Sequence, residues 1–362
     1  MRILISGGGT GGHINPGLAI ADYFKEKDPG CEILFVGTKR GLEHELVPKA
    51  GYNIKYIEVA GFRRKISFDT LVTVKKMFKG YSQSRKILKE FKPDAVIGTG
   101  GYVCGPVLYA ASQMKIKTFV HEQNVVPGVT VKLLARTADV VFTSFSDTDK
   151  YMDSKKLVLS GNPISPSVCS ADRDDARRKI GLDARPVILA YGGSLGATMV
   201  NDAVCEYLEK TVSKGEYQFI FATGKREYDR VKEKLGILSE CPNLQLLPYI
   251  YNMAECMAAS DLVISRAGAM TVSELAAMGR PAVLIPSPNV AHNHQEFNAR
   301  SLEKKGAAAV ILESELNFDT LSGKINELLG SPEKIQIMSE NSKKTGILNA
   351  TEIIYNTVMS KI

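Results

Sequence analysis

Three glycine-rich turns, each following a short apolar run typical of a β-strand, constrain the fold of this 362-residue chain most strongly. They span residues 7–13, 98–106 and 192–197. Glycine lets backbone N–H groups approach a phosphate closely, and the amino end of a following helix favours the same anion. Two such turns in the first third and one past the middle predict two nucleotide-binding-type halves facing one cleft, as in an enzyme that handles two phosphorylated molecules.

Strand-like runs alternate with helical patterns along the whole chain, which predicts an α/β fold with parallel sheets covered by helices on both faces. The length suits two such domains. After Gly161-Asn162-Pro163 the chain turns polar and irregular, so we expect domains over residues 1–164 and 165–345. The expected strands cover 2–6, 32–36, 54–59, 95–98, 118–121, 140–143, 186–191, 218–223, 244–248, 262–265, 282–285 and 308–312.

The composition is that of an ordinary globular protein, with 44% hydrophobic and 23% charged residues, and excludes disordered and fibrous classes. Six scattered cysteines without a Cys-x-x-Cys pair indicate reduced thiols rather than disulfides or a zinc site. The amino terminus lacks the apolar stretch of a signal peptide, and no apolar run approaches the roughly 20 residues that span a bilayer. We therefore expect a cytoplasmic protein. No cluster of histidines and carboxylates has the spacing of metal ligands, so we expect no metal and no cofactor.

One segment carries most of the positive charge. Residues 62–92 hold ten Lys and Arg against Asp69 and Glu90, whereas the whole chain has a net charge of +7. Apolar residues are interleaved with these cations, so the segment is either a helix that packs on its own domain with solvated lysines or a surface drawn to anionic lipid. Nucleic acid is disfavoured because no reader motif accompanies the charge.

The first turn also fits the dinucleotide pattern G-x-G-x-x-G through Gly7, Gly9 and Gly12. A dinucleotide-dependent dehydrogenase needs an acidic residue at the end of the second strand to hold the ribose. Here that strand ends in Phe-Val-Gly-Thr at 35–38, which disfavours an oxidoreductase.

Six motifs stand in one order along nearly the whole chain. They are Gly-Gly-Thr-Gly-Gly-His at 8–13, Gly-Thr-Gly-Gly-Tyr-Val-Cys-Gly-Pro at 98–106, His-Glu-Gln-Asn at 121–124, Gly-Asn-Pro at 161–163, Gly-Gly-Ser-Leu-Gly-Ala at 192–197 and Ser-Arg-Ala-Gly-Ala-Met-Thr-Val-Ser-Glu at 265–274. With these motifs the chain resembles the bacterial family 28 glycosyltransferases that add N-acetylglucosamine to lipid I in peptidoglycan synthesis. The resemblance implies a GT-B fold, in which the first Rossmann-like domain binds the acceptor and the second mainly binds UDP-N-acetylglucosamine. It also implies a C-terminal segment, 346–362, whose helix at about 350–359 packs back on the first domain.

The donor site follows from chemistry and from this resemblance. Ser194 and the amides of 193–196 stand where a strand meets a helix, and are expected to hold the UDP diphosphate. By the resemblance Glu274 accepts the ribose hydroxyls, although its spacing from Thr271 also fits a helix capping box. The resemblance further implies a backbone contact of Ile250 with uracil, and contacts of Gln295 and Asn124 with the sugar. The full set expected to bind UDP-N-acetylglucosamine is Thr10, Gly11, Gly12, Asn124, Ser194, Ile250, Ala269, Met270, Thr271, Val272, Ser273, Glu274 and Gln295.

The acceptor diphosphate is expected near the first two glycine loops, at Gly9, Gly101, Tyr102 and Gly105, with residues 10–12 close by. His13 is the leading candidate for the base that deprotonates the acceptor hydroxyl, because imidazole titrates near neutral pH. Alternatively it hydrogen-bonds phosphate oxygens.

Three other titratable residues enter the choice of base. Glu122 is the rival base, or a structural carboxylate that orients His121. His44 and His292 are assigned to the surface.

Two positions depart from the family pattern. Ser165 stands where family members carry an arginine that touches the donor, and a double glutamine of the family is here His294-Gln295, so only Gln295 is carried over. Another basic residue would have to replace the arginine, or its contact is dispensable.

The sequence thus predicts an inverting, metal-independent hexosyltransferase that forms lipid II by attack of the muramyl C4 hydroxyl on the anomeric carbon. It would be peripheral at the cytoplasmic face of an anionic membrane, with no nucleic-acid partner. The alternatives are a transferase acting on another membrane lipid such as a diacylglycerol, a UDP-N-acetylglucosamine 2-epimerase of the same fold, and a non-catalytic UDP-sugar sensor at the membrane.

Overall fold

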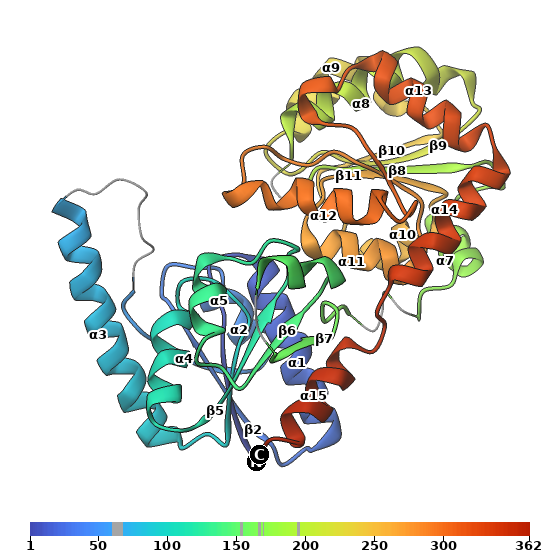
Figure 1. The fold of residues 1–362 in the computed structure, drawn as a ribbon. Coiled ribbons are helices and arrows are strands. Elements are labelled where there is room, and N and C mark those ends of the chain that lie inside the picture. Colours follow the sequence, from blue (N-terminus) through green and yellow to red (C-terminus); the bar gives the residue numbers. More distant parts are fainter. Residues whose placement is uncertain (60–67, 153–154, 166–167, 169, 194–195) are drawn as a thin grey trace. The chain divides into compact units, whose positions relative to one another are not determined.

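The computed structural model describes residues 1–59, 68–152, 155–165, 168, 170–193 and 196–362. Ser194 and residues 62–67 of the basic segment lie outside these ranges, and side chains of the following helix are described from Met77 onward. The chain divides into two compact units (Figure 1). The N-terminal unit comprises residues 1–164 and 349–362, and the C-terminal unit comprises residues 165–348.

The N-terminal unit is built on a seven-stranded parallel sheet with the order β3-β2-β1-β4-β5-β6-β7. Its strands are β1 (Arg2–Ser6), β2 (Glu32–Gly37), β3 (Asn53–Tyr56), β4 (Ala95–Gly98), β5 (Lys117–Glu122), β6 (Val140–Thr143) and β7 (Leu157–Leu159). Its helices are α1 (Gly11–Lys27), α2 (Glu43–Lys49), α3 (Phe68–Phe91), α4 (Cys104–Gln113), α5 (Val129–Leu134), the 3-10 helix η1 (Ser146–Tyr151) and α15 (Ala350–Met359).

The C-terminal unit holds a six-stranded parallel sheet with the order β10-β9-β8-β11-β12-β13. The strands are β8 (Val187–Tyr191), β9 (Gln218–Ala222), β10 (Leu244–Leu247), β11 (Leu262–Ser265), β12 (Ala282–Leu284) and β13 (Ala309–Val310). The α-helices are α7 (Arg173–Ile180), α8 (Thr198–Thr211), α9 (Tyr228–Leu235), α10 (Met253–Ala259), α11 (Ala269–Met278), α12 (His294–Glu303), α13 (Phe318–Leu329) and α14 (Pro332–Thr345). The 3-10 helices are η2 (Val212–Lys214), η3 (Gly236–Glu240), η4 (Ala291–Asn293) and η5 (Glu313–Glu315).

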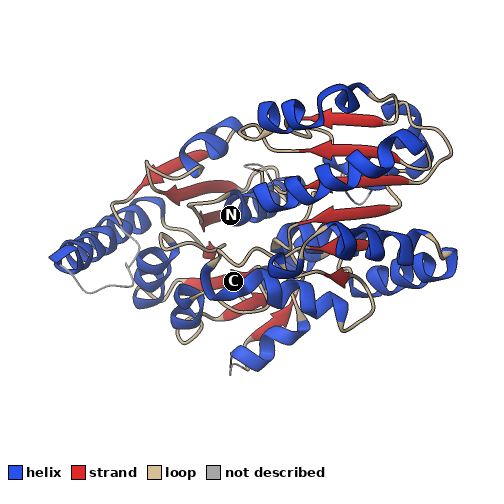
Figure 2. Cartoon of the chain, turned by 90° about the horizontal axis from the view of Figure 1, so that it is seen from above, coloured by secondary structure: helices blue, strands red, loops and turns tan. Residues whose placement is uncertain are grey.

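The predicted fold class is confirmed, since helices lie along both faces of each parallel sheet (Figure 2). Burial on both faces explains why the strands are continuous apolar runs: Ile3, Leu4 and Ile5 in β1 are all fully buried. All twelve expected runs form strands. The sequence missed β7, which has three residues and pairs with β6.

The last helix of the chain belongs to the core of the N-terminal unit. In α15, Ile354 and Val358 are fully buried in the same apolar cluster as Ile3. The Tyr355 ring meets the Phe24 ring of α1 edge-on, with centroids 4.9 Å apart. The sheet of this unit is therefore covered by segments from both ends of the sequence.

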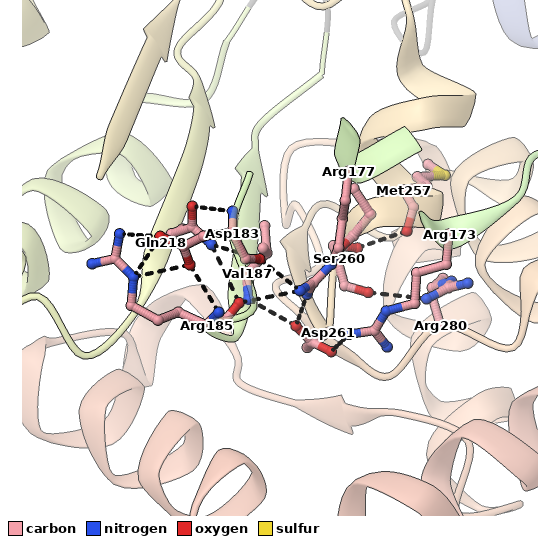
Figure 3. Close-up of polar contacts among 11 residues, drawn as sticks. Arg173, Arg177, Asp183, Arg185, Val187, Gln218, Met257, Ser260, Asp261 and Arg280 are labelled. Carbon is pink, nitrogen blue, oxygen red and sulfur yellow. Dashed lines mark hydrogen bonds and ion pairs between the residues drawn. The ribbon is translucent and has the colours of Figure 1, made fainter. Parts of the chain in front are cut away.

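The amino ends of β8 and β11 are joined by a charged network (Figure 3). Asp261, just before β11, accepts hydrogen bonds from the Val187 amide at 2.8 Å and from Arg177 at 2.6 Å. Arg173 pairs with the other carboxylate oxygen. Asp261 thus attaches α7 to the amino edge of the sheet, away from its glycine-rich loop.

Candidate active site

In the N-terminal unit, the first two glycine loops meet at the carboxyl ends of β1 and β4. The sheet order changes direction between these strands, and in open parallel sheets such a point is where ligands bind. The Gly8 amide donates to the Gly100 carbonyl at 3.3 Å. Gly101 has φ +81°, and a Cβ there would overlap the Gly8 carbonyl. Glycine is therefore required for the two backbones to touch.

His13 lies in the first turn of α1, directly after the first loop. Its Nδ1 is 3.0 Å from the carbonyl oxygen of Gly8. Because a carbonyl can only accept, Nδ1 carries the proton and Nε2 holds the lone pair. The Thr99 hydroxyl donates to the backbone carbonyl of His13 at 2.7 Å, which ties this turn to the second loop. A proton on Nδ1 of His13 is what a base acting through Nε2 requires.

Glu122 ends β5 and is buried with its carboxylate oxygens occupied. They accept the amides of Asn124 and Gly128, each at 2.9 Å, and the Asn124 side-chain NH₂ at 3.2 Å. Burial raises the pKa of this carboxyl, although the N–H donors oppose the rise. The Glu122 side chain therefore shapes the loop that follows β5. That loop contains the predicted donor residue Asn124.

The contacts of His121 differ from the expected pairing with Glu122. Its Nε2 donates to the Gly161 carbonyl at 3.0 Å, and its Nδ1 accepts from the Gln123 side chain at 3.0 Å. Burial lowers the pKa of His121 to about 4, so the ring is neutral. Asn162 donates to the Gln123 carbonyl at 3.1 Å. The Gly-Asn-Pro motif is thus an anchor for the end of β5, and the divergent Ser165 follows it on the surface.

The predicted acceptor residues all lie on these loops or on the helix turns that follow them. Gly9, Thr10 and Gly12 are exposed, and Tyr102 is 41% exposed. His44 and His292 are exposed, as expected. The remaining predicted positions of this edge are Gly11, Gly101 and Gly105, all partly exposed.

In the C-terminal unit, a pocket of about 550 Å³ opens at the carboxyl ends of β8, β11 and β12. It again lies where the strand order changes direction, between β8 and β11. Gly193 and Gly196 of the third glycine loop line it, together with Thr271 and Gln295. Gly196 has φ +82°, and its hypothetical Cβ would overlap the Thr223 carbonyl.

Glu274 lies in the second turn of α11, the helix that contributes Thr271 to the pocket. The helix starts at Ala269 with Gly268 as its N-cap, so the capping-box alternative for Glu274 is wrong. Burial raises the pKa of its carboxyl to about 7. Tyr191 and Ser265 are paired residues of β8 and β11, and both hydroxyls are buried near it. Neither makes a hydrogen bond of normal geometry with a protein group in the described part of the chain.

Gln295 and Arg266 face the same pocket with different partners. The Gln295 side-chain oxygen accepts the Ser287 amide at 2.9 Å, which leaves its NH₂ group as a donor. Arg266 donates to the Ile285 carbonyl at 3.2 Å and pairs with Glu313. Sequence reasoning missed Arg266 and Glu313 as pocket residues. The only available signal was a cation directly after a predicted strand.

The other predicted donor residues of this unit follow β10 or lie on α11. Ile250 is buried just after β10, and Ala269, Met270, Val272 and Ser273 form the first turns of α11. Among the described residues, no group of three or more His, Cys, Asp or Glu is placed to hold a metal ion.

Helix α3 presents a mixed apolar and basic surface. Phe78 is 72% and Met77 41% exposed, and Arg85, Lys86 and Lys89 are exposed along the same helix. Ile87 and Leu88 are buried in the cluster that includes α4. The helix thus packs on its own unit and still exposes large apolar side chains. Within the described ranges, no helix is both long and apolar enough to span a membrane.

Comparison with known proteins identifies both halves of the chain. The description "Glycosyltransferase family 28 N-terminal domain" matches residues 3–143, and "Glycosyltransferase family 28 C-terminal domain" matches residues 187–354. A protein of Acetivibrio thermocellus is 52% identical over 99% of this chain and 97% of its own length. A protein of Clostridioides difficile is 45% identical over 99% of this chain and 88% of its own. Both are named UDP-N-acetylglucosamine--N-acetylmuramyl-(pentapeptide) pyrophosphoryl-undecaprenol N-acetylglucosamine transferase.

Solved structures agree with these relatives. The crystal structure of Acinetobacter baumannii MurG has a TM-score of 0.81 and 28% identity, covering 99% of both chains. A UDP-GlcNAc 2-epimerase from Neisseria meningitidis has a TM-score of 0.70 but 15% identity, covering 99% of this chain and all of its own, and shares the fold alone.

Proposed function

Because the chain belongs to glycosyltransferase family 28, we propose that it transfers N-acetylglucosamine from UDP-N-acetylglucosamine to the C4 hydroxyl of the muramyl sugar of lipid I, releasing UDP and lipid II for peptidoglycan synthesis. The observation that carries this function is the full-length similarity, up to 52% identity, to enzymes named for this reaction. The roles of individual residues rest on the geometry at the carboxyl ends of the strands in each of the two sheets.

The N-terminal unit binds the acceptor. The loop at Gly101 and the amino end of α1 provide N–H donors and a positive dipole for the lipid I diphosphate, and the exposed Gly9 lies beside them. Thr10, Gly11 and Gly12 form that helix start and are accessible to a ligand. Tyr102 precedes α4, and Gly105 lies in the first turn of that helix.

His13 is the general base. Its Nδ1 proton is held by the Gly8 carbonyl, so Nε2 accepts the proton of the C4 hydroxyl while the oxygen attacks the anomeric carbon. Attack opposite to the departing UDP inverts the configuration and gives a β-1,4 disaccharide. Glu122 is the weaker candidate, because its two oxygens already accept three N–H groups.

The C-terminal unit binds the donor. Glu274 accepts the ribose hydroxyls, the Gln295 NH₂ group binds the sugar, and the Ile250 backbone reads uracil. The amides around Gly193 and the amino end of α8 stabilise the charge that grows on UDP as the sugar leaves. Ser194, expected on the same diphosphate, lies outside the described residues.

The enzyme docks peripherally on the cytoplasmic face of the membrane through α3. Its acceptor is anchored in lipid, so the site must work at that surface. Exposed Phe78 and Met77 would enter the interface, while Arg85, Lys86 and Lys89 would attract anionic headgroups.

One assay tests the function. The protein is incubated with UDP-N-acetylglucosamine and a lipid I analogue, and disaccharide and UDP are measured. We expect equal amounts of both. UDP release without disaccharide, or glycosylation of a diacylglycerol in place of lipid I, would contradict the proposal. Formation of a UDP-sugar epimer without any acceptor would instead favour the epimerase alternative.

A further inference from the structure

Glu43 is a buried carboxylate beside the first glycine loop, and the mechanism above does not use it. It is the first residue of α2 and is 1% exposed. One oxygen, Oε2, accepts the Gly9 amide at 2.9 Å. The other, Oε1, accepts the amide and the hydroxyl of Thr38 at 2.8 and 2.7 Å. Burial opposes ionisation, but these hydrogen bonds outweigh it and hold the pKa of Glu43 below its ordinary value.

The chain leaves room for this carboxylate. A Cβ at Gly8, Gly37 or Gly41 would overlap side-chain atoms of Glu43. Three glycines from two loops therefore surround one acid, which places its charge against the backbone of the first loop. A residue that only started α2 would not need such close enclosure.

The Gly9 amide and the Gly8 carbonyl belong to the same peptide group. In a trans peptide the N–H and C=O point in opposite directions. The N–H end meets the Glu43 carboxylate, and the C=O end meets His13 Nδ1 at 3.0 Å. One peptide group thus connects the carboxylate to the imidazole.

We propose that Glu43 is a positioning residue for His13, acting through the peptide group between Gly8 and Gly9. A carboxylate at the N–H end polarises the peptide and strengthens its carbonyl as an acceptor. The stronger acceptor holds the Nδ1 proton of His13, keeps the lone pair on Nε2 and stabilises the imidazolium that forms when the acceptor proton is taken. This inference rests on the proposed role of His13 as the base.

The groups described beside the His13 ring are uncharged. Thr10 and Gly100 lie beside the ring, and the neutral Gln123 approaches from the loop after β5. His121 and Glu122 make the separate hydrogen bonds described above.

Charged and titratable groups on the neighbouring elements have other surroundings. Lys39 and Arg40 are exposed in the loop before α2, and the Lys39 ammonium lies over the Tyr56 ring. Tyr355 of α15 packs against Tyr23 and Phe24 near the far end of α1. Glu43 is joined to His13 through the peptide group between Gly8 and Gly9.

Glu43→Gln tests the inference with little change in volume. The amide can offer its oxygen to Thr38, but its NH₂ would then face the Gly9 N–H, so the link to the peptide is lost. We expect kcat to fall about ten- to hundredfold, as for loss of one charge-assisted hydrogen bond. The acid limb of the kcat–pH profile should move to lower pH, because an anion that favours imidazolium has been removed.

Thr38→Val is the matched control. It removes one hydrogen bond to the same carboxylate but keeps the bond from Oε2 to Gly9. Thermal unfolding should register a loss of stability in both variants, whereas Thr38→Val should leave the acid limb in place. If it moves the limb as far as Glu43→Gln does, Glu43 is merely structural and the inference is overturned.

The tautomer of His13 provides a readout that does not depend on catalysis. ¹⁵N NMR of the folded protein, with the His13 signal assigned by its loss in His13→Gln, should show a protonated Nδ1 in the parent and a smaller Nδ1–H fraction in Glu43→Gln. An unchanged tautomer with an unchanged acid limb overturns the relay while leaving His13 as the base. Full activity of His13→Gln overturns the proposed base instead.

Discussion

The carboxyl edges of the two sheets differ in how far the protein itself satisfies their polar groups. In the N-terminal unit, Glu43, Glu122 and His121 are buried, and each has hydrogen-bond partners on neighbouring loops. In the C-terminal unit, the Tyr191 and Ser265 hydroxyls are buried without such partners in the described part of the chain. The protein itself satisfies these polar groups of the first edge, whereas among the described residues it leaves the two hydroxyls of the second edge unsatisfied.

This difference suits the two tasks assigned to the units. A general base must hold one tautomer and one orientation before the substrate arrives. A nucleotide site can leave donors and acceptors uncompensated, because the ligand supplies their partners on binding. The cost of an unsatisfied buried polar group is about 1–3 kcal/mol, so the empty C-terminal unit should be less stable than its apolar packing alone suggests.

The largest effect should come from His13, at the preorganised edge. His13→Ala should lower kcat by roughly 10²–10⁴-fold, since a general base acts through the transition state. The Michaelis constant for UDP-N-acetylglucosamine should change little. Steady-state kinetics with a soluble lipid I analogue measures both. A larger loss in Glu122→Ala than in His13→Ala would reverse the assignment of the base.

Glu274→Gln, in the C-terminal unit, should change donor binding, whereas His13→Ala should change turnover. Loss of a charged hydrogen bond to ribose, worth about 1.5–3 kcal/mol, should raise the donor Michaelis constant at least tenfold at pH 8. In the parent, with a pKa of about 7, that constant should rise as pH falls from 8 to 6, because the ionised acceptor is lost. The variant should lack this pH dependence.

The same substitution should increase stability. A carboxyl whose pKa is raised in the folded protein stabilises it below the unfolded value near 4.5, and this contribution is lost as pH rises through about 7. At pH 8 Glu274→Gln should therefore be more stable than the parent by about 2 kcal/mol, and the gap should close toward pH 5. Thermal melts at the two pH values test this. If parent and variant had equal Tm at both pH values and equal donor Michaelis constants, Glu274 would not belong to the donor site.

Charge reversal on the two units separates membrane attraction from general electrostatics. Lys86→Glu with Lys89→Glu on α3 should weaken binding to anionic vesicles about thirtyfold, from about 1 kcal/mol per basic residue. Lys214→Glu with Lys304→Glu in the C-terminal unit makes the same change in net charge and should have little effect. Co-sedimentation at low and high salt measures both. If vesicle binding is unchanged by the charge reversal on α3, this helix face is solvent-exposed surface with no part in membrane binding.

The smallest expected effect is at Tyr191. Tyr191→Phe removes a buried hydroxyl that makes no hydrogen bond of normal geometry among the described residues, so the protein without nucleotide should gain about 1 kcal/mol. If the nucleotide complex satisfies that hydroxyl, saturating UDP should reduce the gain. Thermal shift with and without UDP measures this difference. If Tyr191→Phe is less stable than the parent without UDP, the carboxyl edges of the two sheets do not differ as described.

The sequence predicted the parallel sheets because strands buried on both faces are continuous apolar runs, as in β1. It also placed His13 at a helix start, since glycines and a histidine are adjacent in the chain. It could not predict Glu43, whose partner Gly9 lies 34 residues away. Nor could it predict the pairing of Arg266 with Glu313, 47 residues apart. Local patterns show which residues begin a helix, but long-range hydrogen bonds depend on how strands are ordered.

The position of α15 sets the order in which the protein can fold during synthesis. The N-terminal unit buries Ile354 and Val358 in its core, yet these residues follow the whole C-terminal unit in the chain. At about 5–20 residues per second, the ribosome adds the intervening segment in roughly 10–40 s. During that interval the apolar side chains that pack against α15, such as Phe24 of α1, lack their cover. The unit that is synthesised first is therefore the last to be completed, and a chain that stops before residue 350 would leave its core unfinished.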